Sequence, residues 1–288
     1  MNRVEYVLEV QKVSKKYSHS DFQLRDISFK IPKSSIVGFI GENGAGKTST
    51  FGTILSSLKK QNGTIKIFDK VEPHNDISIK ENIGVVFDNN NFSENISITQ
   101  LSKVLSNIYR QWDNEKFFKY IDLFSLPKNG LVGKLSRGMS MKLSISVALS
   151  HNAKLLLLDE ATSGLDPVSR DEVLTILKDY VKNNECSILL SSHIISDIDL
   201  IADHLIFIKS GEILLDISKS KLLDDYSILE CKSKDLEMVK EIALAYTYKN
   251  KDLIEVLVSN DKVIPDRFFR KNSSLNEITL MLLRGKRI

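Results

Sequence analysis

Residues 41–50, which read Gly-Glu-Asn-Gly-Ala-Gly-Lys-Thr-Ser-Thr, constrain the fold more than any other stretch of the chain. They match the pattern G-x-x-x-x-G-K-[ST], in which a phosphate-binding loop joins a strand to a helix. Ile36–Ile40, before the loop, is apolar like a buried strand, and apolar residues recur at helical spacing from Phe51 to Leu58 after it. We therefore predict a strand–loop–helix junction that binds a nucleoside triphosphate.

The residue types in this loop suit a phosphate ligand. Glycines let the backbone curl so that several N–H groups point at one anion, and the following helix contributes the positive end of its dipole. Lys47 is expected to reach the β- and γ-phosphates, and the Thr48 hydroxyl is expected to bind Mg²⁺. The loop residues predicted to bind nucleotide are Gly41, Glu42, Asn43, Gly44, Ala45, Gly46, Lys47, Thr48 and Ser49.

Charge and hydropathy argue against several other classes of protein. The chain has 40 basic and 37 acidic residues, and this balance argues against a concentrated basic face, so we expect no nucleic-acid partner. No run approaches the roughly 18 apolar residues that span a bilayer, and residues 1–6 lack the apolar core of a signal peptide. Cys186 and Cys231 lie far apart without a metal-ligand pattern, which favours a reducing cytosol.

Two carboxylates follow a wholly apolar run at residues 155–158. A strand that is apolar on both faces suits the interior of a parallel sheet, and its carboxyl end is where ligands of open α/β sheets bind. Asp159 is expected to bind Mg²⁺ opposite Thr48. Glu160 is placed to orient or deprotonate the attacking water. A strand that merely ends in a polar turn is the alternative, and the phosphate loop upstream favours the site.

The N-terminal region alternates apolar and polar residues over residues 5–13 and 22–31, which predicts two antiparallel strands. Tyr17 is predicted to lie in the turn between them. It is either an aromatic platform for a nucleotide base or an ordinary surface tyrosine, and position alone favours the second interpretation.

Further along, residues 83–88 are predicted to form a central strand of the main sheet, ended by the turn residues Asn89, Asn90 and Asn91. From residue 97 to about residue 126 the apolar spacing becomes helical. This block interrupts the alternation of strands and helices, so we predict an inserted helical subdomain with its aromatic residues in the core.

Two later stretches have polar residues at the ends of predicted elements. Ser136 precedes a helical pattern and fits an N-cap; it is either only a cap or part of a helix start that binds a second molecule's phosphate. His193 ends the apolar strand predicted at residues 187–193. A single histidine is weak evidence, but this one falls on the same sheet edge as Lys47 and Asp159, so we expect it to contact the γ-phosphate.

Taken in order, the motifs from residue 6 to residue 217 resemble those of the ATP-binding subunit of ATP-binding cassette (ABC) transporters. By this resemblance Tyr17 is the adenine-stacking aromatic, residues 41–48 are Walker A, and residues 155–160 are Walker B. The catalytic residues would be Glu160, His193 and Lys47, the metal ligands Thr48 and Asp159, and the D-loop aspartate Asp166. Residues 135–139 resemble the LSGGQ signature, whose Ser136, Arg137, Gly138 and Met139 would act on the nucleotide of a partner cassette.

The chain departs from the family pattern at two motifs. The lid loop usually carries glutamine where this chain has Asp88, or Asn89 if the alignment slips. In the signature, Arg137 replaces the first glycine and Met139 the glutamine, while Ser136 and Gly138 are kept. Since the two phosphate-facing positions are kept, we expect an active site.

The resemblance implies an α/β fold: a P-loop NTPase with an ABC-type antiparallel β-subdomain and an inserted helical subdomain, plus a small C-terminal α+β extension. We expect residues 1–217 to form the nucleotide-binding domain, with the helical subdomain at about residues 95–150. Residues 218–288 would be the extension, with strands near 227–230 and 253–258 and helices near 236–246 and 275–283. Its basic tail, residues 284–287, is either solvated or in contact with an anionic membrane surface.

The implied function is ATP hydrolysis that drives a separate integral membrane permease, in the export direction. The cofactors would be ATP and Mg²⁺, and the partner a second copy of the cassette or a paralogous ATPase. The chain would be cytoplasmic and bound peripherally to the membrane through its permease. Two alternatives stay open: a soluble ABC ATPase that acts on ribosomes or DNA, and a nucleotide-gated module that does not hydrolyse ATP, although Glu160 argues against the latter.

Overall fold

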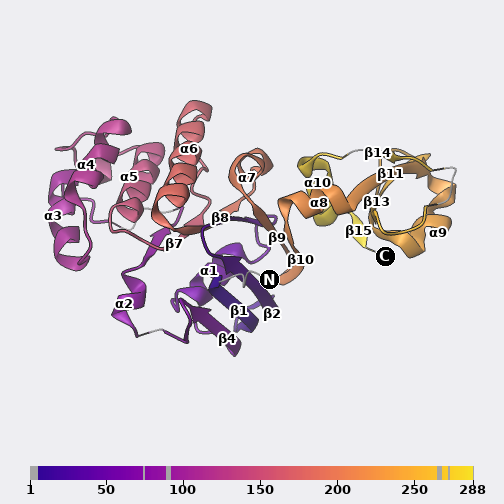
Figure 1. Ribbon diagram of the computed structural model, residues 1–288, viewed down its shortest axis with the longest axis horizontal. Coiled ribbons are helices and arrows are strands. Elements are labelled where there is room, and N and C mark those ends of the chain that lie inside the picture. The colour runs from indigo at the N-terminus through magenta and orange to yellow at the C-terminus, as the bar shows by residue number, and fades with distance from the viewer. Residues whose placement is uncertain (1–5, 74, 89–91, 265–267, 272, 288) are drawn as a thin grey trace.

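The computed structural model describes residues 6–73, 75–88, 92–264, 268–271 and 273–287. Its strands form three sheets within these residues (Figure 1). The main sheet has the order β10-β9-β3-β8-β7-β6. Its strands are β6 (Ile83–Val86), β3 (Ile36–Ile40), β7 (Leu155–Asp159), β8 (Ser187–Ser192), β9 (His204–Lys209) and β10 (Glu212–Ser218).

All neighbours in the main sheet are parallel except β9 and β10, which are antiparallel. Every residue of β3, β7 and β8 is buried, as expected for parallel strands covered on both faces. The carboxyl ends of β3, β7 and β8 therefore meet at one edge, and the residues that follow these strands gather there.

The prediction that residues 83–88 form a central strand is wrong. Among the described strands, β6 lies at the edge of the main sheet and pairs only with β7. Ile83 and Val86 are nevertheless buried, at 7% and 1% exposed. Val86 belongs to the core cluster that includes residues of helix α5 (Arg137–Leu149), and Ile83 belongs to the cluster on the other face. A helix can bury a short apolar strand as well as a neighbouring strand can, so hydropathy alone does not reveal which one does.

The second sheet is antiparallel, with the order β2-β1-β4-β5, which confirms the two predicted N-terminal strands. Its strands are β1 (Tyr6–Tyr17), β2 (Ser20–Pro32), β4 (Asn62–Ile67) and β5 (Lys70–Val71). Tyr17 is the last residue of β1, paired with Ser20, and not part of the turn as predicted. One core cluster joins this sheet to β3 and to α1 (Lys47–Ile54), with Phe39 stacked on Phe51 at 6.0 Å between ring centroids.

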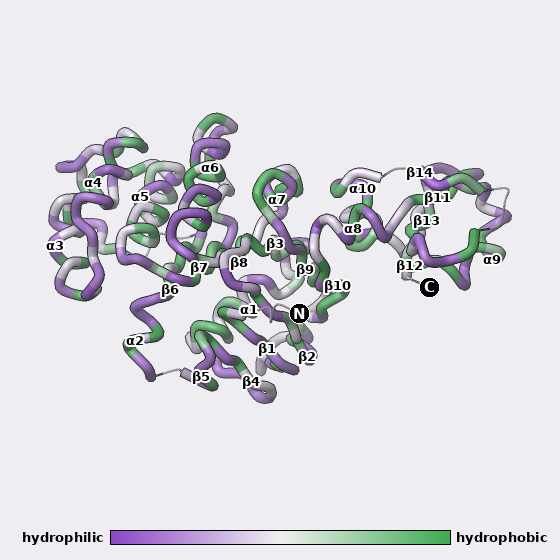
Figure 2. Tube along the Cα trace, in the orientation of Figure 1, coloured by the Kyte–Doolittle hydropathy of each residue, from purple (hydrophilic) through white to green (hydrophobic). Residues whose placement is uncertain are grey.

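The helical block consists of α3 (Ile98–Ile108), α4 (Asn114–Leu123), a 3₁₀ turn (Val132–Lys134) and α5. Hydrophobic and hydrophilic residues alternate along α3 and α4 in Figure 2, as expected for helices with one buried face. Phe117 and Phe124 are buried, at 0% and 4% exposed, and Trp112 and Phe118 are partly buried against the same cluster. The prediction that the aromatic residues of this block lie in the core is therefore confirmed. The other helices before residue 218 are α2 (Ile77–Lys80), α6 (Pro167–Asn184) and α7 (Ile195–Ile201).

The C-terminal region has its own antiparallel sheet, with the order β14-β11-β13-β12-β15 (Figure 1). Its elements are α8 (Lys219–Asp225), β11 (Tyr226–Lys232), α9 (Leu236–Val239), β12 (Ala243–Tyr248), β13 (Leu253–Ser259), β14 (Arg270–Lys271), α10 (Leu275–Arg284) and β15 (Lys286–Arg287). Short 3₁₀ turns (Ser233–Asp235 and Lys240–Ile242) flank α9. None of the helices in the described ranges is both long and apolar enough to cross a bilayer.

One predicted helix in this region is partly wrong. The stretch 236–246 is helical only as α9 and the following 3₁₀ turn, and from Ala243 it is strand β12. The side chains of β12 alternate, with Leu244 44% exposed and Ala245 2% exposed, and the strand pairs with β13. That pairing partner comes later in the chain and overrides the local helical spacing.

Candidate active site

The phosphate-binding loop connects β3 to α1, and two of its glycines need left-handed backbone angles. Gly44 has φ 80° and Gly46 has φ 114°. At Gly46 a Cβ would also lie 2.8 Å from Leu24 Cδ2, so a larger residue would be both strained and crowded. A cavity of about 350 Å³ opens beside the loop. It is lined by Phe22, Glu42, Asn43, Gly44, Gly46, Lys47, Thr48, Ser49 and Glu160.

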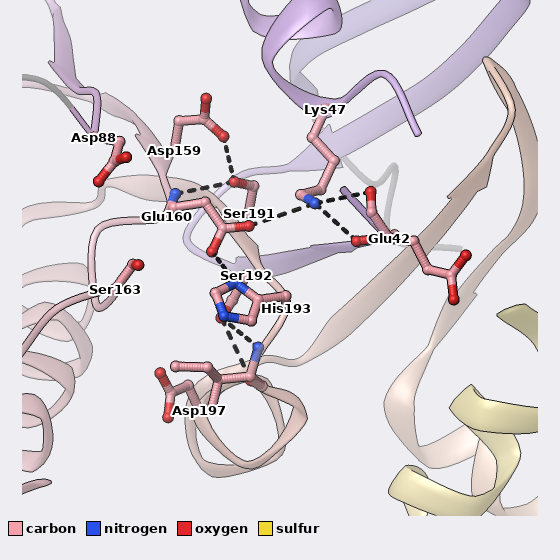
Figure 3. A network of polar contacts seen from close by, with 12 residues as sticks. Glu42, Lys47, Asp88, Asp159, Glu160, Ser163, Ser191, Ser192, His193 and Asp197 are labelled. Carbon is pink, nitrogen blue, oxygen red and sulfur yellow. Dashed lines mark hydrogen bonds and ion pairs between the residues drawn. The ribbon is translucent and has the colours of Figure 1, made fainter. Parts of the chain in front are cut away.

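Lys47 and Glu160 face each other at the loop (Figure 3). The Lys47 side chain is 6% exposed, and its Nζ donates to the carbonyl oxygens of Gly41 (2.7 Å) and Glu42 (3.3 Å). The same Nζ lies 3.4 Å from Glu160 Oε1. The other carboxylate oxygen, Glu160 Oε2, is 2.5 Å from His193 Nδ1. The structure therefore brings together the three residues predicted to be catalytic, with the glutamate between the two nitrogens.

Thr48 and Asp159 also meet. Asp159 is 3% exposed, and its Oδ2 accepts a hydrogen bond of 2.6 Å from Thr48 Oγ1. Its Oδ1 accepts one of 2.5 Å from Ser191 Oγ. A hydroxyl and a buried carboxylate are the hard oxygen donors that Mg²⁺ prefers when substrate phosphates complete its coordination. The residues present therefore fit the predicted metal.

The backbone at Glu160 is unusual. Its φ is 54°, in the left-handed region that non-glycine residues rarely adopt. Its N–H donates to Ser191 Oγ (3.0 Å) and to the Ser191 carbonyl (3.2 Å), which hold this conformation. The chain turns at once after β7, so that Asp159 points to Thr48 while Glu160 points to Lys47 and His193.

Tyr17 is half-buried beside the loop. Its hydroxyl donates to Ser49 Oγ at 2.9 Å, and its ring lies 6.1 Å from that of Phe22. Lys15 Nζ lies 4.8 Å from the centre of the Tyr17 ring. An aromatic ring is therefore held next to the phosphate-binding loop by its own hydroxyl.

The signature residues lie at the start of α5. Ser136 is the N-cap, as predicted, and its Oγ accepts from the Met139 N–H at 3.3 Å. Gly138 packs against the loop after β7, where a Cβ would lie 3.6 Å from the Gly164 carbonyl oxygen. The cavity beside the phosphate-binding loop is lined by other residues of the described chain, so the structure does not bring the signature to that cavity.

The D-loop and lid residues take up different roles. Asp166 caps α6, and its carboxylate accepts from the Ser169 N–H at 3.0 Å. Hydrogen bonds from Ser169 lower the pKa of Asp166 below its usual range. Asp88 forms an ion pair with Arg137 of the signature. The alternative lid residue Asn89, and the turn predicted over Asn89, Asn90 and Asn91, lie outside the described residues.

Known proteins share both the sequence and the fold. Residues 24–163 match the family described as ABC transporter. Over 220 residues the chain is 30% identical to the ABC transporter ATP-binding protein YtrB of Bacillus subtilis, which covers 76% of this chain and 75% of that protein. This chain belongs to the ABC transporter ATP-binding proteins. It is also 31% identical over 214 residues to the bacitracin transport ATP-binding protein BcrA of Bacillus licheniformis (73% of this chain, 69% of that protein).

Among solved structures, a dimeric ATP-binding cassette in a post-hydrolysis state with bound ADP and phosphate has a similar fold. The TM-score is 0.65 at 20% sequence identity, over 73% of this chain and 98% of that one. The predicted fold class is thus confirmed. As a member of the family, this ABC transporter ATP-binding protein binds and hydrolyses ATP to power transport.

Two site residues were missed in the sequence. Ser191 lies directly opposite Asp159 in the pairing of β7 with β8; its only signal was a hydroxyl near the end of an apolar strand. Asp197 is buried in the first turn of α7, and burial raises its pKa. It lies 3.9 Å from Arg170, whose guanidinium donates to the Leu165 carbonyl. These contacts support the segment after His193 and the D-loop.

The C-terminal helix also reaches the phosphate-binding loop. Arg284 Nε lies 3.3 Å from Glu42 Oε1, and Leu283 lines a second cavity, of about 280 Å³, beside residues 42–45. The first residue of the basic tail is therefore paired with the loop.

Proposed function

We propose that this ABC transporter ATP-binding protein hydrolyses Mg-ATP at sites shared between two cassettes and that its permease works as an exporter. The observation that carries the catalytic part is the position of the Glu160 carboxylate, between Lys47 Nζ and His193 Nδ1 at the edge where Thr48 meets Asp159. A base, a phosphate-binding cation and a second polar nitrogen are what attack by water on a γ-phosphate requires.

The roles follow from these positions. The N–H groups of residues 41–49 and the Lys47 ammonium bind the phosphates, and the ring of Tyr17 stacks on the base. Glu160 accepts a proton from water as the water oxygen bonds to the γ-phosphorus and the bond to ADP breaks. His193 holds the other oxygen of that carboxylate and contacts the γ-phosphate. When Mg²⁺ is bound, Thr48 and Asp159 hold it, and it supplies positive charge to the phosphate oxygens.

The second half of each site would come from a partner cassette. In this arrangement Ser136 and the N–H groups at the start of α5 donate to the partner's γ-phosphate. Two-fold symmetry then makes two equivalent sites. The similar solved cassette is dimeric, which supports this arrangement. The partner is a second copy of this chain or a paralogous ATPase.

The division of the chain is also part of the proposal. Residues 1–217 form the nucleotide-binding domain and residues 218–288 the extension, which has its own sheet and its own core cluster. The chain would act at the cytoplasmic face of the membrane, held there by its permease. Because a relative is named for bacitracin transport, bacitracin is the first cargo to test.

Replacing the proposed base tests the function. Glu160→Gln should bind Mg-ATP normally but lose kcat by roughly 100-fold or more, because water is no longer deprotonated. Lys47→Ala should lose the binding of Mg-ATP as well as its hydrolysis. The control is Glu230→Gln, the same chemical change at a residue of the C-terminal sheet that pairs with Lys249, and it should keep wild-type activity. Phosphate release and nucleotide binding are measured together; hydrolysis at the wild-type rate by Glu160→Gln would refute the assignment.

A further inference from the structure

Two of the positions where the chain departs from the family pattern, Arg137 and Asp88, contact each other. Arg137 is the first residue of α5, and Asp88 follows strand β6, 49 residues earlier. Arg137 Nη2 forms an ion pair with Asp88 Oδ1. Glycine at the first position would have no side chain to reach Asp88, so the acidic residue and the basic residue make a contact that the family's usual residues do not make.

Arg137 also reaches the loop that follows the catalytic strand. Its Nη2 is 3.5 Å from Ser163 Oγ. The side chain lies across Gly164, where a Cβ would be 3.2 Å from Arg137 Nε and 3.3 Å from Cδ. Figure 3 shows Asp88 and Ser163 on the same side of Asp159. One guanidinium therefore joins three segments: the end of β6, the start of α5 and the loop between β7 and α6.

We propose that Arg137 and Asp88 form a latch, meaning their ion pair together with the Arg137–Ser163 contact, and that Arg137 is a positioning residue for ATP hydrolysis. Arg137 lies between Ser136 and Gly138, which face the partner's phosphate in the proposed function on which this inference rests. Ser163 is three residues after Glu160. The start of α5 serves the partner's nucleotide, and the loop after β7 belongs to the chain's own nucleotide site. The latch thus fixes the orientation of the start of α5 relative to this loop.

The side chains of the latch are too exposed to contribute much to the stability of the fold, so a positioning role can be tested separately from stability. The side chains of Arg137 and Asp88 are 58% and 47% exposed, and ion pairs this exposed add little to folding. Loss of the latch should therefore leave the melting temperature nearly unchanged. It should instead disturb the relative orientation of the segments, which affects the chemical step more than the binding of ATP.

A double-mutant cycle on the full chain tests the latch. Arg137→Met keeps much of the side chain's length without its charge, and Asp88→Asn keeps the shape of its partner. Each single variant should lower kcat by about fivefold to tenfold and keep KM for Mg-ATP within about twofold of wild type. The kcat of the double variant should be no lower than that of the less active single variant. Lys128→Met is the matched control, because it breaks an equally exposed pair with Asp122 in the helical block.

Two results would overturn the latch. If Arg137→Met loses activity while Asp88→Asn keeps it, Arg137 acts without the Asp88 carboxylate, and the ion pair is not part of the mechanism. If the two losses multiply, the residues act independently. Glu160→Gln, measured alongside, tests the proposed function separately from the latch. If this variant is inactive, the proposed function stands whatever the double-mutant cycle shows. If it hydrolyses ATP at the wild-type rate, the proposed function itself is refuted.

Hydrogen exchange gives a readout that does not depend on turnover. Both single variants should exchange the amides of residues 135–141 and 161–166 faster than wild type, because the segments are no longer tied together. Lys128→Met should not change them. Unchanged exchange in both single variants would contradict the latch.

Discussion

At the scale of single residues, the site depends on a hydroxyl that no motif contains. Ser191 Oγ donates to Asp159 and accepts from the N–H of Glu160, so one side chain sets two consecutive residues with different tasks. It also holds Glu160 at its positive φ. The geometry of both carboxylates therefore depends on a residue of the neighbouring strand.

Ser191→Ala should lower kcat by about tenfold, because both carboxylates lose their anchor, and it should cost about 1–3 kcal/mol of stability for the polar groups left unpaired. Ser187→Ala is a matched control at the other end of β8, where the buried hydroxyl donates to the Pro32 carbonyl at 2.9 Å. It should cost similar stability and keep kcat. Equal activity in the two variants, by steady-state kinetics and thermal melting, would contradict the role of Ser191.

At the scale of elements, a buried histidine connects the helical block to the main sheet. His151 follows α5 and is 1% exposed, and its ring stacks on Tyr109 at 4.2 Å between centroids. Its Nδ1 is 3.1 Å from the Glu81 carbonyl, next to β6. Burial lowers the pKa of His151 below its usual value of 6.5.

This depressed pKa makes a pH prediction. Because the pKa of His151 is lower in the folded chain, the unfolded chain binds a proton at this residue more readily below pH 6.5. His151 therefore lowers the free energy of unfolding as the pH falls below 6.5, and it has no such effect well above pH 6.5. His151→Gln should flatten this dependence between about pH 7.5 and pH 5.5, even if the variant is less stable overall. Thermal melting of both chains across the range is the measurement; parallel curves would show that His151 does not titrate on unfolding.

At the scale of the whole molecule, the described contacts leave the signature outside the chain's own phosphate cavity. If each γ-phosphate bridges two chains, dimer stability becomes linked to nucleotide binding. Without ATP the facing phosphate sites would be empty and rich in hydrogen-bond donors, so the contact between the two chains should be weak. Blocking hydrolysis should then trap the closed state.

The Glu160→Gln chain should therefore be monomeric without nucleotide and dimeric with saturating Mg-ATP, as measured by light scattering. Adding Ser136→Arg should abolish the dimer, because a bulky side chain would hold the helix start away from the phosphate. Ser106→Arg, the same change at an exposed residue of α3, should leave the dimer intact. A permanent monomer, both for the isolated chain and for the chain with its permease, would contradict the shared site.

The sequence by itself determined the local features of this protein. The glycine and lysine pattern of residues 41–48 predicts the loop between β3 and α1, the apolar run before Asp159 predicts a buried parallel strand, and Ser136 predicts a helix start. These depend on neighbouring residues, which periodicity and residue type report directly. The ordered motifs also predict the family, because no single one is as specific as the set.

Only the tertiary structure decided which distant residues meet. In the folded protein β6 lies at the edge of the main sheet, and β12 pairs with β13. Ser191 lies beside Asp159, and Arg137 forms an ion pair with Asp88. Each of these contacts depends on the order of strands or on the packing of a helix against a loop, and neither leaves a periodic trace in the chain. Hydropathy predicts that a strand is buried, but the choice of neighbour depends on the free energy of the whole fold.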